Sequence, residues 1–515
     1  MTRGVLAAPA GLSALFDNPE ESIRGPERVG DFDTYLADFS GWQLNLPEGT
    51  PCIWVKSTDF VGLFDRQSVL ALQEVARKRA WLNCVVLVFV DGVVEKLPGD
   101  MSLALPRFVF FDAAEQHVLE TAVFPPTTFL GMLRTKMSTP ELAPYEVCQP
   151  VTGSRFFGRQ AEIERVLQNP QTNYLFVGIR RIGKTSLLKE IKRQLDRLDP
   201  PEPHQVRRVY IDCTVISSEE EFMRTLIFQL EQSGLTILSS RAQDPLRYQK
   251  RILDHYGMVH GSPITFLLDE FDRLLAHMKP DWPLLQVLKT AVQSHKVRFI
   301  AAGFRRAMEA TTDQNSPLYN LMTPIRLGRL SLAVVENMVL TPLSRLGILV
   351  DEPAQVVERI YQETAGLPNY AQYYCRILVE QLAASEKTVM TAADLVTVQD
   401  NVAFRDFVLN TFMSNTELLE QAIVYAIIDE GETAVLPNFT ERNIHNLLKN
   451  RKLSLSFAQI DNACRKLEMA GVFNRVDAEY TFAVPLFRLM LQQTRDVSFL
   501  FERTREALQT ENVLP

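Results

Sequence analysis

A glycine-rich loop between a strand and a helix constrains this chain of 515 residues more than any other feature. Residues 178–185 read GIRRIGKT, which is the pattern Gly-x-x-x-x-Gly-Lys-Thr. A short apolar strand is predicted at 174–177, and an apolar stripe from Leu187 to Leu198 predicts a helix after the loop. A strand, such a loop and a helix in this order form the context in which the motif binds phosphate. The segment therefore predicts an α/β fold with a phosphate site.

The residue types of this loop suit a nucleoside triphosphate with a magnesium ion. Glycines let backbone N–H groups curl around a phosphate, and the helix N-terminus adds its partial positive charge. Lys184 can reach the β- and γ-phosphates, and the Thr185 hydroxyl is placed for Mg²⁺. We therefore expect ATP or ADP and Mg²⁺ as cofactors. The loop residues expected to bind them are Gly178, Ile179, Arg180, Arg181, Ile182, Gly183, Lys184, Thr185 and Ser186.

A second candidate motif is a pair of acids at the end of a buried strand. The apolar residues 264–268 run directly into Asp269 and Glu270. Alone, such a pair is commonly a solvated strand end, but a strand in this type of fold also delivers a carboxylate to the metal. We expect Asp269 to bind Mg²⁺, through water, and Glu270 to polarise the attacking water as a general base. Lys184 is expected to assist catalysis.

Arginines in two places have more than one interpretation. A strand predicted at 297–302 is followed by Arg305 and Arg306. Arg305 could sense the γ-phosphate or stabilise charge that builds on it, and we treat it as a candidate catalytic residue. The alternative is a surface arginine pair. Arg180 and Arg181 could likewise contact phosphate, solvent or a neighbouring subunit.

The patterns divide the chain into seven segments. Strands predicted at 52–55, 84–90 and 108–111, with a helix at 66–79, indicate a small α/β domain. Further strands at 174–177, 209–213, 264–268 and 297–302 alternate with helices and favour a mostly parallel sheet. Helices dominate after residue 331. The expected segments are 1–45 irregular, 46–137 small α/β domain, 138–154 linker, 155–330 P-loop ATPase core, 331–410 helical lid, 411–495 winged-helix domain and 496–515 C-terminal tail.

The winged helix is predicted from three short helices and a hairpin. The helices are expected at 419–428, 441–448 and 457–470, and the hairpin strands at 471–473 and 480–483. Residues 421–490 hold eight Lys/Arg and eight Asp/Glu, a balance that suits DNA poorly. Protein contact or autoinhibition is therefore favoured over DNA binding, although a small basic patch keeps DNA open. That patch would comprise Lys449, Arg451, Lys452, Arg465 and Lys466.

Together these residues resemble the STAND-type P-loop ATPases, in particular their archaeal-ATPase-like branch among AAA+ relatives. The resemblance covers about residues 155–495. It is carried by 156–162 (FFGRQAE), the GIRRIGKTSLL loop, the LLDEFDRLL strand end, 316–319 (SPLY) and 366–368 (GLP). It implies that Phe157, Gly158 and Arg159 lie around the adenine, and that Pro368 opens a helical lid over the nucleotide. It also implies a winged helix packed on the ATPase core.

The leading functional hypothesis is an ATP-driven molecular switch, with the N-terminal module as sensor, effector or docking piece. The resemblance implies signalling or antiviral defence as its setting. The alternatives are a DNA-associated AAA+ ATPase similar to origin-recognition or transposition ATPases, and a degenerate protein that only binds nucleotide. Candidate partners are a second copy through the ATPase core, a protein at the N-terminal or winged-helix domain, and DNA.

Composition limits the cellular setting. The net charge is −8, and residues 1–150 hold 12 Lys/Arg against 19 Asp/Glu, so bulk charge gives no sign of a nucleic-acid binder. No apolar run exceeds seven residues, so no membrane contact is expected. Six widely spaced cysteines favour free thiols in a reducing compartment, and we expect a cytoplasmic protein.

Overall fold

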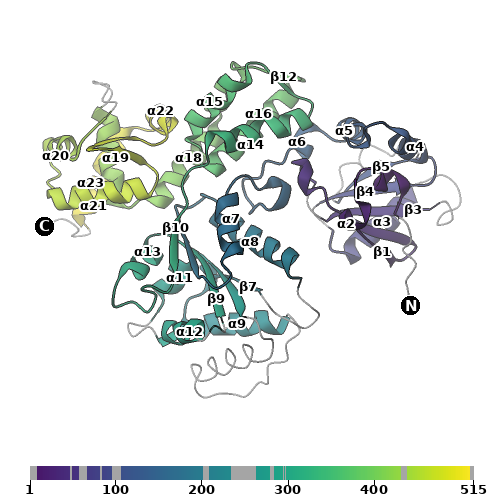
Figure 1. Cartoon of the computed structure of the whole chain (residues 1–515). Helices are drawn as coiled ribbons and strands as arrows, with labels where there is room; N and C mark the ends of the chain where they lie inside the picture. Colours follow the sequence, from purple (N-terminus) through teal and green to yellow (C-terminus); the bar gives the residue numbers. More distant parts are fainter. Residues whose placement is uncertain are drawn as a thin grey trace.

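The computed structural model describes residues 8–46, 49–56, 66–81, 84–94, 106–200, 208–232, 263–278, 283–293, 295, 297–430 and 438–510. Figure 1 shows an N-terminal α/β part on the right, a second α/β part below the centre, and two helical parts above and to the left. Within the described ranges, no helix has both the length and the apolar character needed to cross a membrane.

The N-terminal part is built on a five-stranded sheet in the order β1-β2-β3-β4-β5. The first three strands pair antiparallel, and β3, β4 and β5 pair parallel. Alternate residues of β4 enter two different apolar clusters, one on each face of the sheet. The elements are α1 (Ala10–Ser13), α2 (Pro19–Ser22), β1 (Ile23–Val29), β2 (Phe32–Ala37), β3 (Thr50–Val55), α3 (Arg66–Lys78), β4 (Val85–Val90), β5 (Arg107–Phe111), α4 (Ala113–Thr121) and α5 (Pro125–Lys136).

The prediction that residues 1–45 are irregular is wrong, because β1 and β2 belong to this sheet. β1 is an edge strand, where a residue such as Pro26 is tolerated because it need not donate to a neighbouring strand. In β2 the acidic Asp33 is buried, and Lys56 Nζ donates to its Oδ2 at 2.5 Å. Local composition therefore hid a strand whose charge is neutralised by a residue far along the chain.

The segment expected to be a linker is packed against its neighbours. It contains α6 (Thr139–Leu142), and Leu142 is buried. The Tyr145 hydroxyl donates to the Met338 carbonyl at 3.0 Å, and the Gly153 N–H donates to Glu190 Oε2 at 3.0 Å. These bonds fasten the connection to the helices on both sides of it.

The second sheet confirms the expected parallel α/β core. Its order is β10-β6-β9-β8-β7, with all neighbours parallel. β9 lies between β6 and β8, so the loop after β6 and the acids after β8 flank one strand end. The sequence Thr-Pro-Ile-Arg of β10, on the sheet edge, gave no strand signal. The elements are α7 (Gln160–Gln168), β6 (Tyr174–Val177), α8 (Lys184–Leu198), β7 (Arg208–Asp212), α9 (Glu219–Gln232), β8 (Ile264–Asp269), α11 (Phe271–Ala276), α12 (Pro283–Gln293), β9 (Val297–Gly303), α13 (Arg305–Thr312) and β10 (Thr323–Arg326).

Helices dominate the rest of the chain, as predicted. The three helices expected near the C-terminus are present within two residues of the predicted bounds. The hairpin is also present, but its first strand, β13, begins at Phe473, where the predicted strand 471–473 ends. The residues expected to be a tail form α23, which packs on α19 through the buried Phe501 and Leu508. The elements are α14 (Leu332–Arg345), β11 (Leu349–Val350), α15 (Pro353–Thr364), α16 (Pro368–Ala384), β12 (Val389–Met390), α17 (Asp394–Gln399), α18 (Val402–Asn415), α19 (Leu418–Glu430), α20 (Glu441–Asn450), α21 (Phe457–Met469), β13 (Phe473–Val476), β14 (Glu479–Phe482), α22 (Pro485–Thr494) and α23 (Val497–Thr510).

Candidate nucleotide-binding site

The phosphate loop connects β6 to α8 and depends on its two glycines. A Cβ at Gly178 would lie 2.8 Å from Ile182 Cγ2, and Gly183 has a φ of +95°, which disfavours other residues. Gly183 is also the N-cap of α8, so the N-terminus of this 15-residue helix points into the loop. Backbone N–H groups and the positive end of the helix thus lie where a phosphate would bind.

Lys184 is folded back onto the loop. Its Nζ donates to the carbonyls of Gly178 at 2.8 Å and Ile179 at 3.0 Å, and the residue is only 6% exposed. Burial lowers the pKa of the Lys184 ammonium, although the nearby Glu270 and Asp269 act in the opposite direction. A buried cation held by carbonyl groups is a site that an anion would stabilise.

The two acids after β8 occupy different positions. Asp269 is buried; its Oδ2 accepts from the Tyr210 hydroxyl at 2.8 Å, and its Oδ1 accepts from the Glu270 N–H at 3.0 Å. Burial, together with the Asp269 charge, raises the pKa of the Tyr210 hydroxyl, which therefore stays a donor. Glu270 begins the turn into α11 with a φ of +48° and lies at the surface of two cavities.

A third acid, Asp272, fixes the end of β9. Its carboxylate accepts from the N–H of Phe304 at 2.5 Å and from the N–H of Ala307 at 3.1 Å, which are free donors at the start of α13. A Cβ at Gly303 would lie 2.5 Å from Ala307 Cβ and 2.7 Å from Asp272 Oδ2. The glycine therefore permits this close approach between the strand end and the acid.

The first cavity, of about 230 Å³, brings together residues far apart in the sequence. It is lined by the loop residues Arg181, Ile182, Gly183, Lys184, Thr185 and Ser186, by Glu270, and by Phe157, Arg159 and Pro368. Three other outcomes concern predicted residues outside this lining. Gly158 has a φ of +75° and packs close to Val334. Gly178 and Ile179 line a different cavity, and the Asp269 side chain is buried. Phe157, Arg159, residues 181–186 of the loop and Pro368 thus surround one space.

Sequence reasoning missed one wall of this cavity, residues 146–151. Glu146 Oε1 accepts from the N–H groups of Val147, Cys148 and Gln149 at 2.9, 2.8 and 3.2 Å. The segment lacks hydrophobic periodicity and contains Pro150, so it resembles a linker. Asn369 and Gln372, which follow Pro368 on α16, also line the cavity, and their helical spacing from Pro368 could have indicated this.

The second cavity, of about 360 Å³, has part of its lining in common with the first. Lys184 and Glu270 line both cavities, and here they are joined by Asp272 and Arg305 of the core. The opposite wall comes from the elements α18 to α23, which we call the C-terminal part of the chain. It consists of Ser414, Asn415, Thr416, Glu417 and Lys466.

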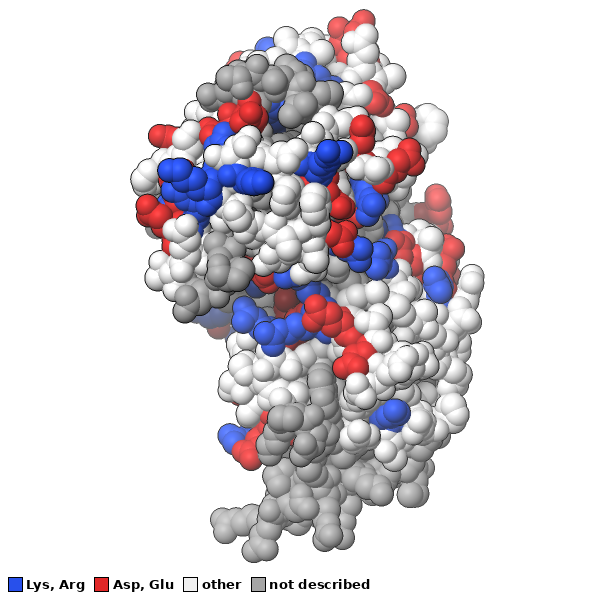
Figure 2. Space-filling model, turned by 90° about the vertical axis from the view of Figure 1, so that its left-hand side faces the viewer, with Lys and Arg blue, Asp and Glu red and all other residues white. Residues whose placement is uncertain are grey.

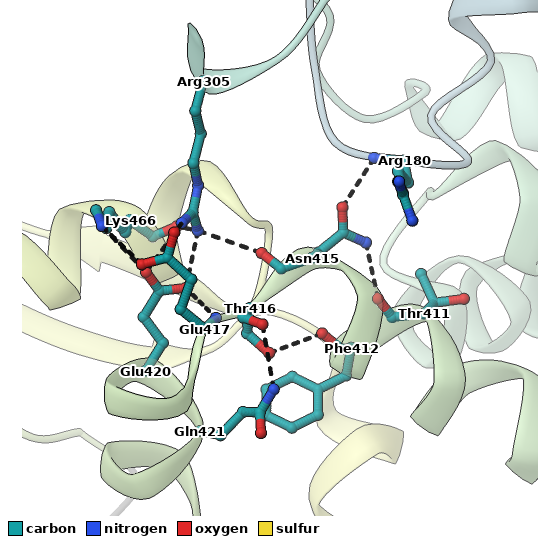
Figure 3. A network of polar contacts seen from close by, with 10 residues as sticks. All are labelled: Arg180, Arg305, Thr411, Phe412, Asn415, Thr416, Glu417, Glu420, Gln421 and Lys466. Atoms are coloured by element: carbon teal, nitrogen blue, oxygen red, sulfur yellow. Dashed lines mark hydrogen bonds and ion pairs between the residues drawn. The ribbon is translucent and has the colours of Figure 1, made fainter. Parts of the chain in front are cut away.

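Arg305 is held by this opposite wall. Figure 3 shows its guanidinium between Glu417 and Glu420. Nη1 and Nη2 donate to the two oxygens of Glu420 at 3.0 and 2.8 Å, and Nη2 also donates to the Asn415 carbonyl at 3.2 Å. Glu420 is 1% exposed. Arg305 is therefore not part of a free surface pair. In this arrangement its guanidinium is bonded to Glu420, and Arg305 lines the cavity that Lys184 also lines.

The two loop arginines contact α18 and the residue at its end. The Arg180 N–H donates to Asn415 Oδ1 at 2.9 Å, as Figure 3 shows. Arg181 Nη1 donates to Thr411 Oγ1 at 2.6 Å, and its guanidinium lies 4.1 Å from the centre of the Phe407 ring. These contacts differ from the three expected alternatives, because the loop arginines contact another helix of the same chain.

Comparison with known protein families identifies one family model that matches part of the chain. Residues 168–309 match the family model of the AAA domain, which includes the phosphate loop and the acids after β8. This part of the chain is therefore an AAA-type domain. No curated protein matches the chain in sequence.

Three solved structures are similar in arrangement. The Walker-type ATPase PABY2304 of Pyrococcus abyssi is 16% identical, with 68% of this chain and 99% of that chain covered and a TM-score of 0.49. The ORC2 protein of Aeropyrum pernix, in ADPNP–ADP complexes, is 14% identical, with 69% and 95% covered and a TM-score of 0.48. The ORC1 protein of the same organism, in complex with DNA, is 14% identical, with 68% and 95% covered and a TM-score of 0.38.

Proposed function

We propose that this chain is an ATP-binding and ATP-hydrolysing molecular switch of the STAND/AAA+ type. The observation that carries the proposal is that Lys184 and Glu270 line two cavities, the second of which has a wall from the C-terminal part of the chain. A nucleotide in these cavities would contact both parts. We also propose a cytoplasmic location, from the widely spaced cysteines, and a setting in bacterial signalling or defence, from the family resemblance.

The residues of the loop fit ATP and Mg²⁺. Lys184 would exchange its carbonyl partners for phosphate oxygens, which compensate its burial better. The metal would be held by the Thr185 hydroxyl and, through water, by Asp269, whose carboxylate is already oriented by Tyr210. When bound, Mg²⁺ supplies neutralisation of phosphate charge. Glu270, at the cavity surface, would orient the attacking water and accept its proton.

The switch requires that two arrangements of the chain bind nucleotide differently. In the arrangement described here, Asn415 holds a loop N–H and Glu420 holds Arg305. A phosphate that recruits Arg305 would compete with Glu420 for it. Binding and hydrolysis would then shift the C-terminal part relative to the core.

The N-terminal module is placed to take part in this shift. Arg134 on α5 donates to the carbonyls of Arg345, at 2.7 and 3.0 Å, and Ser344, at 3.3 Å, at the end of α14. The wall formed by residues 146–151 follows this module in the chain, and the Val151 N–H donates to Ser186 Oγ at 3.1 Å. We therefore assign the module the role of sensor, effector or docking piece.

The DNA-associated alternative is less well supported by this arrangement. The helix α21, which would read DNA in a winged helix, faces the core: Arg305 Nη2 donates to the Lys466 carbonyl at 3.5 Å, and both residues line the second cavity. A DNA reader would have to release this face. A filter-binding titration against salt separates the two proposals, because a steep log–log slope indicates phosphate contacts and a flat one does not.

The proposal is tested with Glu270→Gln. The variant should bind ATP with unchanged affinity, while turnover falls about 10²- to 10⁴-fold because the general base is lost. Glu309→Gln is the matched control, since Glu309 lines the same second cavity but is exposed on α13. Unchanged hydrolysis by Glu270→Gln would refute the role of Glu270, whereas nucleotide binding without hydrolysis in the parent chain would favour a chain that only binds nucleotide. The ATP-trapped variant can also be used to capture partners, including a second copy of this chain.

A further inference from the structure

A third cleft, of about 710 Å³, lies between the core and the C-terminal part. The core contributes the back of the phosphate loop, at Ile179 and Ile182, and the segment after β10. The C-terminal part contributes the end of α21 and strand β13. Figure 2 looks at this side of the molecule and shows blue and red side chains around the hollow between its upper and lower parts.

The charge of this cleft is one-sided. Four arginines line it, two from each side, against the single carboxylate of Glu468. Like charges that face each other across a cleft are unfavourable unless an anion lies between them. The four are Arg326 and Arg329 of the core and Arg465 and Arg475 of the C-terminal part.

Most of these guanidinium groups have no carboxylate partner. Of the four arginines, only Arg465 forms an ion pair with a residue that the structure describes, namely Asp461 at 2.8 Å. Arg329 Nη2 donates to Asn474 Oδ1 at 2.7 Å, across the cleft, and Arg475 Nε donates to the Asp477 carbonyl at 3.0 Å. Burial lowers the pKa of the Arg329 guanidinium, and a nearby anion would offset this effect. Elsewhere at the core boundary, Arg305 and Lys466 are neutralised by Glu420 and Glu417.

The cleft also has the size and the surfaces that a nucleotide requires. Its volume lies within the range of about 300–1,000 Å³ that small-molecule sites occupy. Phe304, Met469 and Phe473 supply apolar surface beside the arginines. The cleft also lies at the carboxyl ends of β6 and β10, where parallel sheets bind ligands.

We propose that this cleft binds a small phosphorylated ligand of nucleotide size, at a site separate from the phosphate loop. The ligand would bridge Arg326 and Arg329 to Arg465 and Arg475 and thereby hold the C-terminal part against the core. Because Ile179 and Ile182 form its wall, its occupancy would also restrict the loop. The site is thus a regulatory site for the proposed switch, although its binding does not depend on ATP hydrolysis.

The test measures binding of inorganic tripolyphosphate by calorimetry to the full chain saturated with ADP and Mg²⁺, and to Lys184→Ala without nucleotide. The second protein keeps the result independent of the proposed function, because its phosphate loop lacks the lysine. Binding should weaken about tenfold for each arginine removed in Arg326→Ala and Arg475→Ala, both of which are exposed. Tripolyphosphate should also raise the melting temperature of the chain but not of the double variant.

The control is Arg224→Ala with Arg442→Ala, which makes the same charge change on exposed helices away from the cleft. Equal weakening in this control would show nonspecific attraction and overturn the proposal. So would the absence of tripolyphosphate binding in both protein backgrounds. A labelled 12-nucleotide single strand serves as the second probe. If only the strand binds, and binding is lost in the cleft variant, the surface is a nucleic-acid site and the small-ligand proposal is wrong.

Discussion

The ion pair between Arg305 and Glu420 offers the sharpest test of how the C-terminal part is held to the core. Glu420 is 1% exposed and accepts two hydrogen bonds from Arg305, whose side chain is 15% exposed. Removing one partner of a buried pair costs about 3–5 kcal/mol, because the other charge loses its main compensation; here Arg305 would keep only the exposed Glu417. We therefore expect this loss for Glu420→Ala. Glu420→Gln keeps the shape and one acceptor, and it should cost about 1–3 kcal/mol.

The measurement is native-state hydrogen exchange, read on peptides from α13 and α19, because it reports the opening free energy of each part of the chain separately. Glu417→Gln is the control: Glu417 also lies near Arg305, at 3.3 Å, but its side chain is 64% exposed. An exposed pair contributes about 0–1 kcal/mol. If Glu420→Ala lowers the opening free energy no more than Glu417→Gln does, the buried pair does not hold these parts together, and the reasoning fails.

Two further substitutions test the surroundings of the site. Gly303→Ala should cost about 1–3 kcal/mol, because its Cβ would lie 2.5 Å from that of Ala307, whereas Gly131→Ala on α5 meets nothing within 4 Å and should not destabilise; thermal unfolding compares them. Burial tends to raise the pKa of Glu190, but bonds from Arg193 and other donors outweigh it and hold the pKa below its ordinary value of 4.5. Glu190→Gln should therefore cost stability at neutral pH, and the difference from the parent chain should vanish as pH falls below 4.5; a constant difference would contradict this.

The parts of the fold that could be predicted are those whose signals are local. The strand at 174–177 has the observed bounds of β6, and the strand at 264–268 differs from β8 by one residue. Both are buried along their whole length and therefore appear as continuous apolar runs. The phosphate loop was recognisable because its glycines are required by backbone geometry at the positions where they stand.

The parts that could not be predicted depend on contacts between distant residues. β2 contains the buried Asp33, whose shorter ion pair is with Lys56, 23 positions away, while Arg28 on β1 lies 3.4 Å from its other oxygen; which strands would bring these charges together is not visible in the sequence. The role of Arg305 was left between two alternatives, and its contact with Glu420 spans 115 positions. Ion pairs between distant residues leave no regular spacing in the sequence, so they cannot be predicted in the way that helices and strands can.

The side chains between Gly178 and Gly183 have a different task from the loop backbone. In the proposed function, backbone N–H groups and Lys184 would bind phosphate, which leaves the side chains of the variable positions free for other contacts. Arg181 uses this freedom to bond Thr411 and to stack on Phe407, both on α18. Any ligand that changes the loop backbone must therefore move or break these contacts. The coupling between phosphate and the C-terminal part thus requires no long pathway, because one loop contacts both.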